Sequence, residues 1–200
     1  MGLYIKNRTK MAVFASGNGS NFQALYEATQ DGRLDADIVL VVADKPSASA
    51  FVLERAKQAG VPAFSFTPRD YASKQAYESM LVEKLDRAGV EWLVLAGFMR
   101  LIGPVLLGAY ENRIVNIHPS VLPAFPGKDA IGQTLEAGAK EAGVTVHFVD
   151  EGMDTGAIIA QRSFPVDGAD RETVERKIHE IEHQLYPESL QQLFSRQQSV

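Results

Sequence analysis

Short apolar segments alternate with longer amphipathic segments along most of this chain of 200 residues. The apolar segments, such as the one from Ile38 to Ala43, are rich in Val, Ile and Leu and have the length of buried strands. The segments between them place apolar residues three or four positions apart, which is the spacing of one face of a helix. This pattern predicts strands at 11–16, 37–43, 62–66, 91–96, 113–117, 144–149 and 157–164, and helices at 21–30, 48–59, 70–88, 104–110, 130–137 and 172–194. We expect Pro187 to kink or break the last helix.

The alternation of strands with helices predicts the fold class. Consecutive strand–helix–strand units favour parallel pairing, so we expect an α/β fold with a doubly wound, mostly parallel sheet and helices on both faces. A chain of this length can build one core unaided, because such a domain buries roughly 70% of the surface of its unfolded chain. We predict a flexible N-terminal lead-in at 1–10 and a single domain over 11–200.

The composition excludes several classes of protein. There is no cysteine, so disulfide frameworks, thiolate zinc sites and thiol nucleophiles are excluded. The longest apolar runs, such as Trp92 to Met99, are far shorter than the roughly 20 residues of a membrane-spanning helix. The net charge is −5 and no basic stripe is present, so a long nucleic acid is not an expected partner. These features predict a cytoplasmic protein with neither a membrane nor a nucleic-acid partner.

Four polar or glycine-rich loops follow predicted strands, at 16–21, 97–100, 116–119 and 150–156. Ligands of open parallel sheets bind beyond the carboxyl ends of the strands. We therefore expect the four loops to share one edge of the sheet and to form a site there. The second loop and the two residues after it combine apolar side chains with Arg100, which fits a flat heteroaromatic ligand and core packing equally well.

The first of these loops, Ser16-Gly17-Asn18-Gly19-Ser20-Asn21, joins a strand to a helix. Glycines let the backbone approach a ligand, and the free N–H groups of a helix N-terminus attract phosphate. Phe22 stands at the place of the third glycine of a dinucleotide-binding fingerprint, which excludes that motif. Phosphate binding and a tight turn capped by Ser or Asn fit this loop equally well.

Asn116 and His118 end a strand two positions apart, so their side chains point the same way. An amide and an imidazole that converge on one spot can stabilise an oxyanion and transfer a proton. From these two residues alone, a structural Asn and His are the better interpretation. Asp154 changes this only if the fold brings it beside His118; otherwise it is a turn residue between two glycines. His147 is interpreted as a hydrogen-bonded sheet histidine with at most an indirect role.

A competing motif lies on the last predicted helix. His179-Glu180-Ile181-Glu182-His183 matches the H-E-x-x-H pattern of zinc proteases, with both histidines on one face. The longer form of the motif fails, because Ser189 stands at the position of its third histidine. Only Glu188 could supply a third ligand further along the chain. We therefore favour a solvated helix face and predict no metal site.

Taken together, these motifs resemble the phosphoribosylglycinamide formyltransferases, a family of folate-dependent enzymes. The resemblance extends over about 11–190 and is carried by segments 16–21, 95–100, 116–120, 145–147 and 153–156. The Asn-x-His pair and the distant Asp belong to the wider family that uses 10-formyltetrahydrofolate, which includes hydrolases. The first loop and the stretch Glu182-His183-x-x-Tyr186-Pro187 are narrower and point to the glycinamide ribonucleotide enzymes.

The resemblance implies roles for the matching residues. Asn116, His118 and Asp154 would be catalytic. Gly19, Ser20 and Asn21 would hold the substrate phosphate, and Glu182 the ribose, with His179 in the same stretch. The residues that would bind the folate are Lys74, Met99, Arg100, Leu101, Ile102, Asn116, Asp150, Glu151, Gly152, Met153 and Asp154. Lys74 stands where the family carries Arg, so this contact would keep the charge and lose the bidentate geometry.

The resemblance also implies a Rossmann-like formyltransferase fold and an activity. The formyl group of the co-substrate 10-formyltetrahydrofolate would pass to the amine of 5'-phosphoribosylglycinamide in de novo purine biosynthesis, by direct attack without a metal. Both partners would be small molecules, and a homodimer is compatible with the sequence. The alternatives are a methionyl-tRNA formyltransferase, a formyltetrahydrofolate hydrolase and a non-catalytic binding protein. The first would add a basic C-terminal domain and the second an N-terminal regulatory domain.

Overall fold

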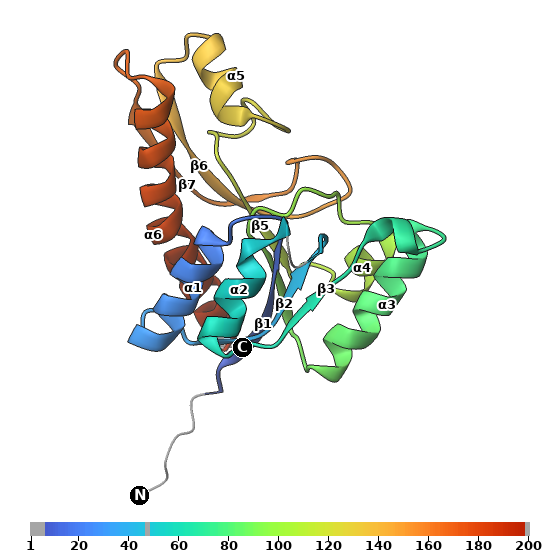
Figure 1. Ribbon diagram of the computed structural model, residues 1–200. Coiled ribbons are helices and arrows are strands. Elements are labelled where there is room, and N and C mark those ends of the chain that lie inside the picture. The colour runs from blue at the N-terminus through green and yellow to red at the C-terminus, as the bar shows by residue number, and fades with distance from the viewer. Residues whose placement is uncertain (1–6, 47–48, 199–200) are drawn as a thin grey trace, which may run out of the picture.

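The computed structural model describes residues 7–46 and 49–198 (Figure 1). Each predicted strand and helix is present, with bounds that shift by a few residues. The strands are β1 Thr9–Ala15, β2 Ala36–Ala43, β3 Ala63–Ser65, β4 Trp92–Leu95, β5 Ile114–His118, β6 Glu141–Phe148 and β7 Ile158–Pro165. The helices are α1 Ser20–Asp31, α2 Phe51–Ala59, α3 Lys74–Arg87, α4 Pro104–Ala109, α5 Ala130–Glu136 and α6 Arg171–Gln197, with a short 3-10 helix at Pro68–Asp70.

The seven strands form one sheet in the order β3-β2-β1-β4-β5-β6-β7. The pairs from β3 to β5 are parallel, whereas β5–β6 and β6–β7 are antiparallel. The prediction of a mostly parallel sheet is therefore confirmed. The chain leaves β1 toward β2 on one side and returns to β4 on the other, so the strand order reverses between β1 and β4, the position where open α/β sheets bind ligands.

Helices cover both faces of the sheet, which confirms the doubly wound prediction (Figure 1). The buried residues of β1 alternate between the two faces, because successive side chains of a strand point to opposite sides. Met11 and Val13 pack with apolar residues of α1, α2 and α6. Ala12 and Phe14 pack with those of α3 and α4. None of the helices in the described part of the chain is both long and apolar enough to span a bilayer.

The N-terminal boundary of the sheet differs from the prediction. β1 begins at Thr9, so the last two residues of the predicted lead-in, 1–10, belong to the sheet. Arg8 precedes them and donates hydrogen bonds to the Asp37 carboxylate at 2.7 Å and to the Thr29 carbonyl oxygen at 3.0 Å. These contacts anchor the start of the strand. Residues 1–6 of the predicted lead-in lie outside the described residues.

The last helix, α6, runs through Pro187 without a break, so of the two expected effects of this proline, a kink or a break, the break is wrong. Proline leaves the carbonyl four residues earlier without its helical donor, which usually costs about 3 kcal/mol. Here Tyr186, Pro187 and Leu190 are all buried against the sheet. This packing on both sides of the proline keeps the helix in place.

Candidate active site

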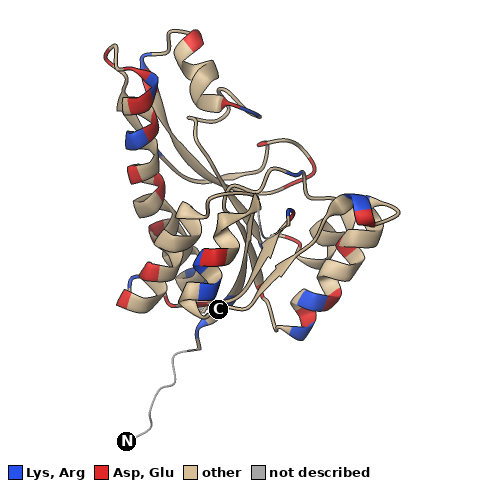
Figure 2. Cartoon of the chain, in the orientation of Figure 1, with Lys and Arg blue, Asp and Glu red and all other residues tan. Residues whose placement is uncertain are grey.

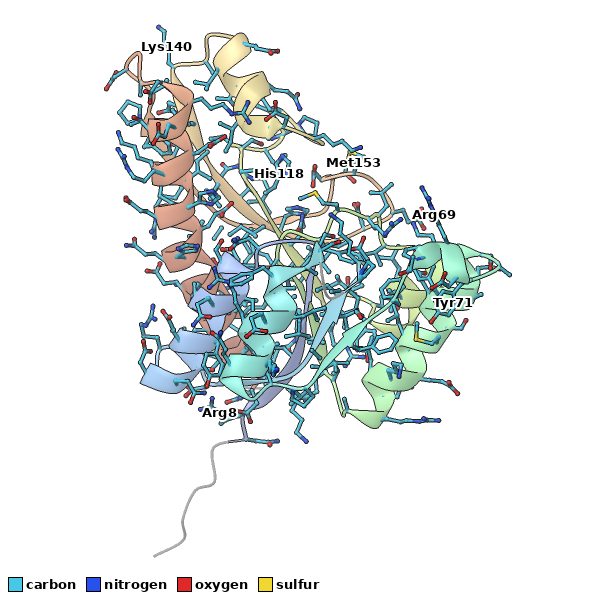
Figure 3. The ribbon with its side chains drawn as sticks, in the orientation of Figure 1. Arg8, Arg69, Tyr71, His118, Lys140 and Met153 are labelled. Carbon is cyan, nitrogen blue, oxygen red and sulfur yellow. The ribbon has the colours of Figure 1, made fainter. Side chains whose placement is uncertain are left out.

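The loops after β1, β4 and β5 meet at one edge of the sheet, as predicted, and enclose a cavity of about 590 Å³ together with α6 and the loop after β6. The prediction placed the end of β6 at the same edge, which is wrong, because β6 is antiparallel to β5 and ends opposite the start of that strand. Figure 3 shows His118 and Met153 at this edge, at the opposite end of the molecule from Arg8. Most of the predicted site residues line the cavity: Gly19, Ser20, Asn21, Met99, Arg100, Leu101, Ile102, Asn116, His118, Asp150, Gly152, Met153, Asp154, His179 and Glu182. Lys74, the exposed first residue of α3, and Glu151, exposed in its loop, are not among the lining residues.

His118 and Asp154 come together although they lie 36 positions apart in the sequence (154 − 118). The Nδ1 atom of His118 lies 3.5 Å from Oδ2 of Asp154, and both side chains are about nine-tenths buried. The other ring nitrogen, Nε2, donates to the carbonyl oxygen of Phe125 at 2.9 Å, because a carbonyl can only accept. The remaining ring nitrogen, Nδ1, faces the Asp154 carboxylate. A catalytic role of Asp154 required that the fold bring it beside His118, and the structure does so.

The backbone around Asp154 explains the spacing of its glycines. Asp154 has a φ of 56°, a left-handed conformation that Asp adopts more readily than most residues. Its Oδ2 accepts a hydrogen bond from the Gly127 N–H at 2.8 Å, which ties the 150–156 loop to the segment after β5. A Cβ atom at Gly156 would lie 1.7 Å from the Phe148 carbonyl oxygen, so only glycine fits there. Asp154 is thus both a turn residue and a neighbour of His118.

Asn116 lies opposite His147 in the antiparallel β5–β6 pair. The Nδ1–H of His147 donates to the Phe148 carbonyl oxygen at 2.8 Å, which leaves Nε2 as an acceptor. The Asn116 amide nitrogen lies 3.3 Å from that Nε2 and donates to it. Burial lowers the pKa of His147, so the neutral ring is favoured. His147 therefore fixes which end of the Asn116 amide carries the donors.

His147 also lies close to Asp154, with 3.7 Å between its Nε2 and the Oδ1 of the carboxylate. The sequence predicted at most an indirect role for this histidine. The structure places it in contact with two of the three predicted catalytic residues. The sequence places His147 on a strand, two residues after Thr145. It does not show the cross-strand register that pairs His147 with Asn116.

The 16–21 loop has the geometry of an anion-binding turn. Gly19 has a φ of 80° and is the residue before α1. No side chain caps the helix there, so its first N–H groups can bind an anion. A Cβ atom at Gly19 would lie 2.7 Å from the Val52 side chain, so α2 packs directly against the loop. Arg55 of α2 donates to the Asn18 carbonyl and side-chain oxygens, both at 2.9 Å. The loop is thus held by a neighbouring helix.

α6 supplies the wall of the cavity next to this loop. The Glu182 carboxylate, whose side chain is 7% exposed, accepts from the Asn21 amide at 3.1 Å and from His179 Nδ1 at 3.2 Å. The hydrogen bond to Glu182 raises the pKa of His179. The oxygen of the Asn21 side chain is buried and has no hydrogen-bond partner among the described residues. These groups leave polar atoms available to a bound sugar.

The two histidines of the H-E-x-x-H pattern stack on one face of α6, with ring centroids 6.3 Å apart. They nevertheless face different surroundings. His179 is bonded to Glu182 and lines the main cavity, whereas His183 lines a second hollow between α1, α2 and α6. Burial lowers the pKa of His183. Across the described ranges, no cluster of three or more His, Asp or Glu side chains has an arrangement suited to a metal ion.

The 97–103 segment forms the opposite wall and carries exposed apolar side chains. Met99 is 71% exposed and Leu101 is 47% exposed, and Met153 faces them from the loop after β6. Large apolar side chains exposed in a cavity are typical of a ligand surface rather than of a core. The backbone of this wall is held by buried polar groups: the Ser16 hydroxyl accepts from the Met99 N–H at 2.9 Å.

Comparisons with known proteins agree with this geometry. The family model described as formyl transferase matches residues 9–190. The chain is 53% identical over 185 residues to phosphoribosylglycinamide formyltransferase of Bacillus subtilis, covering 92% of this chain and 94% of that protein. It is 44% identical to the trifunctional purine biosynthetic protein adenosine-3 of Drosophila melanogaster, covering 94% of this chain and 14% of that protein. Among solved structures, glycinamide ribonucleotide transformylase 1 from Geobacillus kaustophilus is 56% identical, with a TM-score of 0.90 over 94% of this chain and 99% of that chain.

Proposed function

The chain belongs to the formyl transferase family, and we propose that Asn116, His118 and Asp154 carry out its chemistry. The reaction moves the formyl group of 10-formyltetrahydrofolate to the amine of 5'-phosphoribosylglycinamide, a step of purine biosynthesis. The observation that carries the proposal is the convergence of these three residues at the carboxyl end of β5, with 3.5 Å between His118 Nδ1 and the Asp154 carboxylate. Asp154 lies far from the other two residues in the sequence, so the convergence is a result of the tertiary fold.

The cavity offers two regions for the two substrates. The phosphate of the amine substrate is assigned to Gly19, Ser20 and Asn21, where the uncapped start of α1 provides N–H donors and a positive dipole. Its ribose is assigned to Glu182 and His179. The cavity volume of about 590 Å³ lies within the usual range for small-molecule sites.

The folate is assigned to the apolar wall and the loop after β6. The wall comprises Met99, Arg100, Leu101 and Ile102, and the loop comprises residues 150–154. Most of these residues line the cavity. Lys74 and Glu151, which do not, are assigned only to the outer part of the folate. His118 lines the same cavity and is assigned to the junction of the two regions, beside the point where the amine meets the formyl group.

The chemistry follows from the donors around His118. The neutral amine attacks the formyl carbon, a bond forms between them, and the bond from that carbon to the folate nitrogen breaks. Negative charge develops on the formyl oxygen, where the Asn116 amide and the His118 ring provide hydrogen-bond donors. The His118 Nε2–H that now donates to the Phe125 carbonyl is the donor that this oxygen takes over. The amine proton passes to the folate nitrogen through water or His118, and Asp154 balances the charge of the imidazolium.

A transfer assay in the presence of a chelator tests this function. Wild type and His118→Ala are given 10-formyltetrahydrofolate with and without 5'-phosphoribosylglycinamide, and release of tetrahydrofolate is followed. We expect amine-dependent release by wild type and a collapse in the variant. His183→Ala is the matched control, because this histidine lies outside the main cavity and should keep most of the activity.

Other outcomes would identify the alternatives. Release without the amine indicates a hydrolase, and tight binding without release indicates a binding protein. Inhibition by the chelator, together with inactivity of His183→Ala, would support the zinc-hydrolase motif instead. We also propose that the enzyme acts in the cytoplasm on small-molecule substrates. Cell fractionation tests its location.

A further inference from the structure

The 123–129 segment, which lies between β5 and α5, is held by polar contacts rather than by apolar packing. None of residues 123–129 is buried. Phe125, Gly127 and Asp129 have positive φ angles of 55°, 81° and 49°. Phe rarely adopts this left-handed conformation. A backbone of this kind persists only where the groups around it hold it, so the contacts of the segment decide its position.

This segment contacts both members of the His118–Asp154 pair through its backbone. The Phe125 carbonyl oxygen accepts from His118 Nε2 at 2.9 Å. The Gly127 N–H donates to Oδ2 of Asp154 at 2.8 Å. His118 ends β5 and Asp154 lies in the loop after β6, so the segment connects two separate elements at the reacting centre. A displacement of the segment would separate the imidazole from the carboxylate that balances its charge.

Two side chains outside the segment hold its C-terminal end. The Gln133 amide, on α5, donates to the carbonyl oxygens of Pro126 and Lys128 at 3.1 and 2.7 Å. Arg171, the first residue of α6, donates from its two terminal nitrogens to the Asp129 carboxylate at 3.3 and 2.6 Å. α5 and the start of α6 lie side by side (Figure 1). The Arg171–Asp129 pair therefore attaches the end of the segment to α6.

The Arg171–Asp129 pair lies at the surface, where its two side chains are 51% and 58% exposed. Exposed ion pairs contribute little unless they are bidentate or belong to a network. This pair is both, because Nε of Arg171 also donates to Glu175 at 2.7 Å and the Asp129 carboxylate accepts from the Gly132 N–H at 3.3 Å. The hydrogen bonds from Arg171 lower the pKa of Asp129, which keeps the carboxylate charged. A Cβ atom at Gly132 would overlap this carboxylate, so only glycine leaves room for it.

We propose that Arg171 is a positioning residue, which acts on His118 and Asp154 through the 123–129 segment. This inference rests on the proposed function. The planar guanidinium binds both carboxylate oxygens of Asp129, so it fixes the direction of the carboxylate as well as its distance. Arg171 itself is not among the residues that line the main cavity. Its effect on the reaction therefore comes through the contacts of the segment.

The position of Arg171 predicts a change in kcat. Arg171→Met removes the charge and keeps an unbranched apolar side chain. We expect kcat to fall about twofold to fivefold, the scale on which an exposed ion pair favours one conformation. KM for the amine substrate should be unchanged, because its phosphate is assigned to the 16–21 loop. Asp129→Asn keeps an oxygen that can cap α5 and should cause the same loss of kcat. The double variant should add little, because the two residues act as one unit.

The salt dependence of kcat separates the ion pair from other effects of the substitution. Salt screens exposed charges, so raising NaCl from about 0.05 M to about 1 M should lower the kcat of wild type toward that of Arg171→Met. Arg162→Met is the matched control. Arg162 of β7 also pairs with a carboxylate of α6, Glu188 at 3.0 Å, and this pair is similarly exposed. The control should show the kcat of wild type at both salt concentrations.

Hydrogen exchange tests the structural step without turnover. In the protein without substrates, the Gly127 amide should exchange about twofold to fivefold faster in Arg171→Met than in wild type or Arg162→Met. The inference is overturned if, in an active enzyme, this exchange is unchanged or Arg171→Met loses the same fraction of kcat at low and at high salt. A wild type that transfers no formyl group would overturn the proposed function itself, which is a different result from unchanged exchange.

Discussion

Asp154 shows how much of this site depends on the backbone conformation of single residues. Its left-handed conformation, the Gly127 N–H that it accepts from and the tight approach at Gly156 place its carboxylate next to His118. Asn116 is held in a similar way, by an acceptor on His147. Asn116 and Asp154 are thus each oriented by a neighbour, His147 or the Gly127 N–H, that has no assigned role in the reaction itself. Oriented donors stabilise a developing charge without reorganisation, so these neighbours matter for rate.

Replacing Asn116 with Ala should reduce kcat by about 10²–10³-fold, because a donor to the formyl oxygen is lost. Steady-state kinetics with both substrates at saturation measure the change. Asn7→Ala is a suitable control, because the contact described for Asn7 is made by its backbone carbonyl, which accepts from Gln198. A loss of less than about tenfold would argue against a role for Asn116 at the oxyanion.

Asp154→Asn should fold normally and lose activity. Asn tolerates a positive φ as Asp does, and its side-chain oxygen can still accept from the Gly127 N–H. The charge that balances an imidazolium at His118 is removed, so kcat should fall by about 10²-fold, the scale of impaired acid–base catalysis. Circular dichroism and kcat measured on one preparation check both parts. Near-full activity would remove Asp154 from the mechanism.

Among the elements, α6 connects the sheet to the cavity. Near its middle it presents Glu182 to the cavity, and one turn later it presents Tyr186 to the sheet. The buried Tyr186 hydroxyl lies 2.7 Å from the Leu95 carbonyl oxygen, at the end of β4, and 3.2 Å from that of Val115, near the start of β5. The helix is therefore fastened at the two strands that carry the site. This anchoring, rather than helix propensity, accounts for its continuity through Pro187.

Tyr186→Phe should lower the free energy of unfolding by about 1–2 kcal/mol, because two buried carbonyl groups lose their shared donor. Urea denaturation measures the change. Tyr110→Phe is the matched control, since the Tyr110 hydroxyl is buried without a partner in the described part of the chain. Removing an unsatisfied hydroxyl should leave stability unchanged or raise it. Equal losses in the two variants would contradict the anchoring role of Tyr186.

The molecule as a whole combines a parallel half, which holds the 16–21 loop, with an antiparallel extension that completes the cavity. β6 and β7 lie beyond β5, and the antiparallel register of β5 and β6 sets His147 against Asn116. Acidic and basic side chains are interspersed over the outer helices α3 and α6 (Figure 2). A surface with mixed charges suits an enzyme of small anionic substrates, whose recognition takes place inside the cavity.

The stability of the whole protein should fall on acidification, partly through His147. Its folded-state pKa is lowered, so below about pH 6.5 the unfolded chain binds a proton that the folded protein does not. Stability contributed by the neutral ring is therefore present above that pH and is lost as the pH falls. His147→Gln lacks this titration. Between about pH 7.5 and pH 5.5, wild type should lose more free energy of unfolding than the variant.

Urea denaturation of both proteins at the two pH values measures this difference. His179 and His183 are present in both proteins, so their opposite pKa shifts cancel in the comparison. If the two proteins lose the same free energy of unfolding, His147 is not a buried neutral ring in solution.

The sequence by itself determined the elements, the fold class and the edge of the sheet at which the site lies. Apolar periodicity is a local property, and the right-handed crossover of parallel units leaves few topologies for such a pattern. The motifs at 16–21, 116–120 and 153–156, with two further segments, also identified the family.

Tertiary structure decided which side chains touch. The contacts of Asn116 with His147, of His118 with Asp154 and of Arg100 with Asp44 join residues 31, 36 and 56 positions apart. Each depends on strand order, cross-strand register or the path of a loop, and these are fixed by packing of the entire core rather than by the residues near either partner. The same packing kept α6 continuous at Pro187, where local chemistry alone predicted a kink or a break.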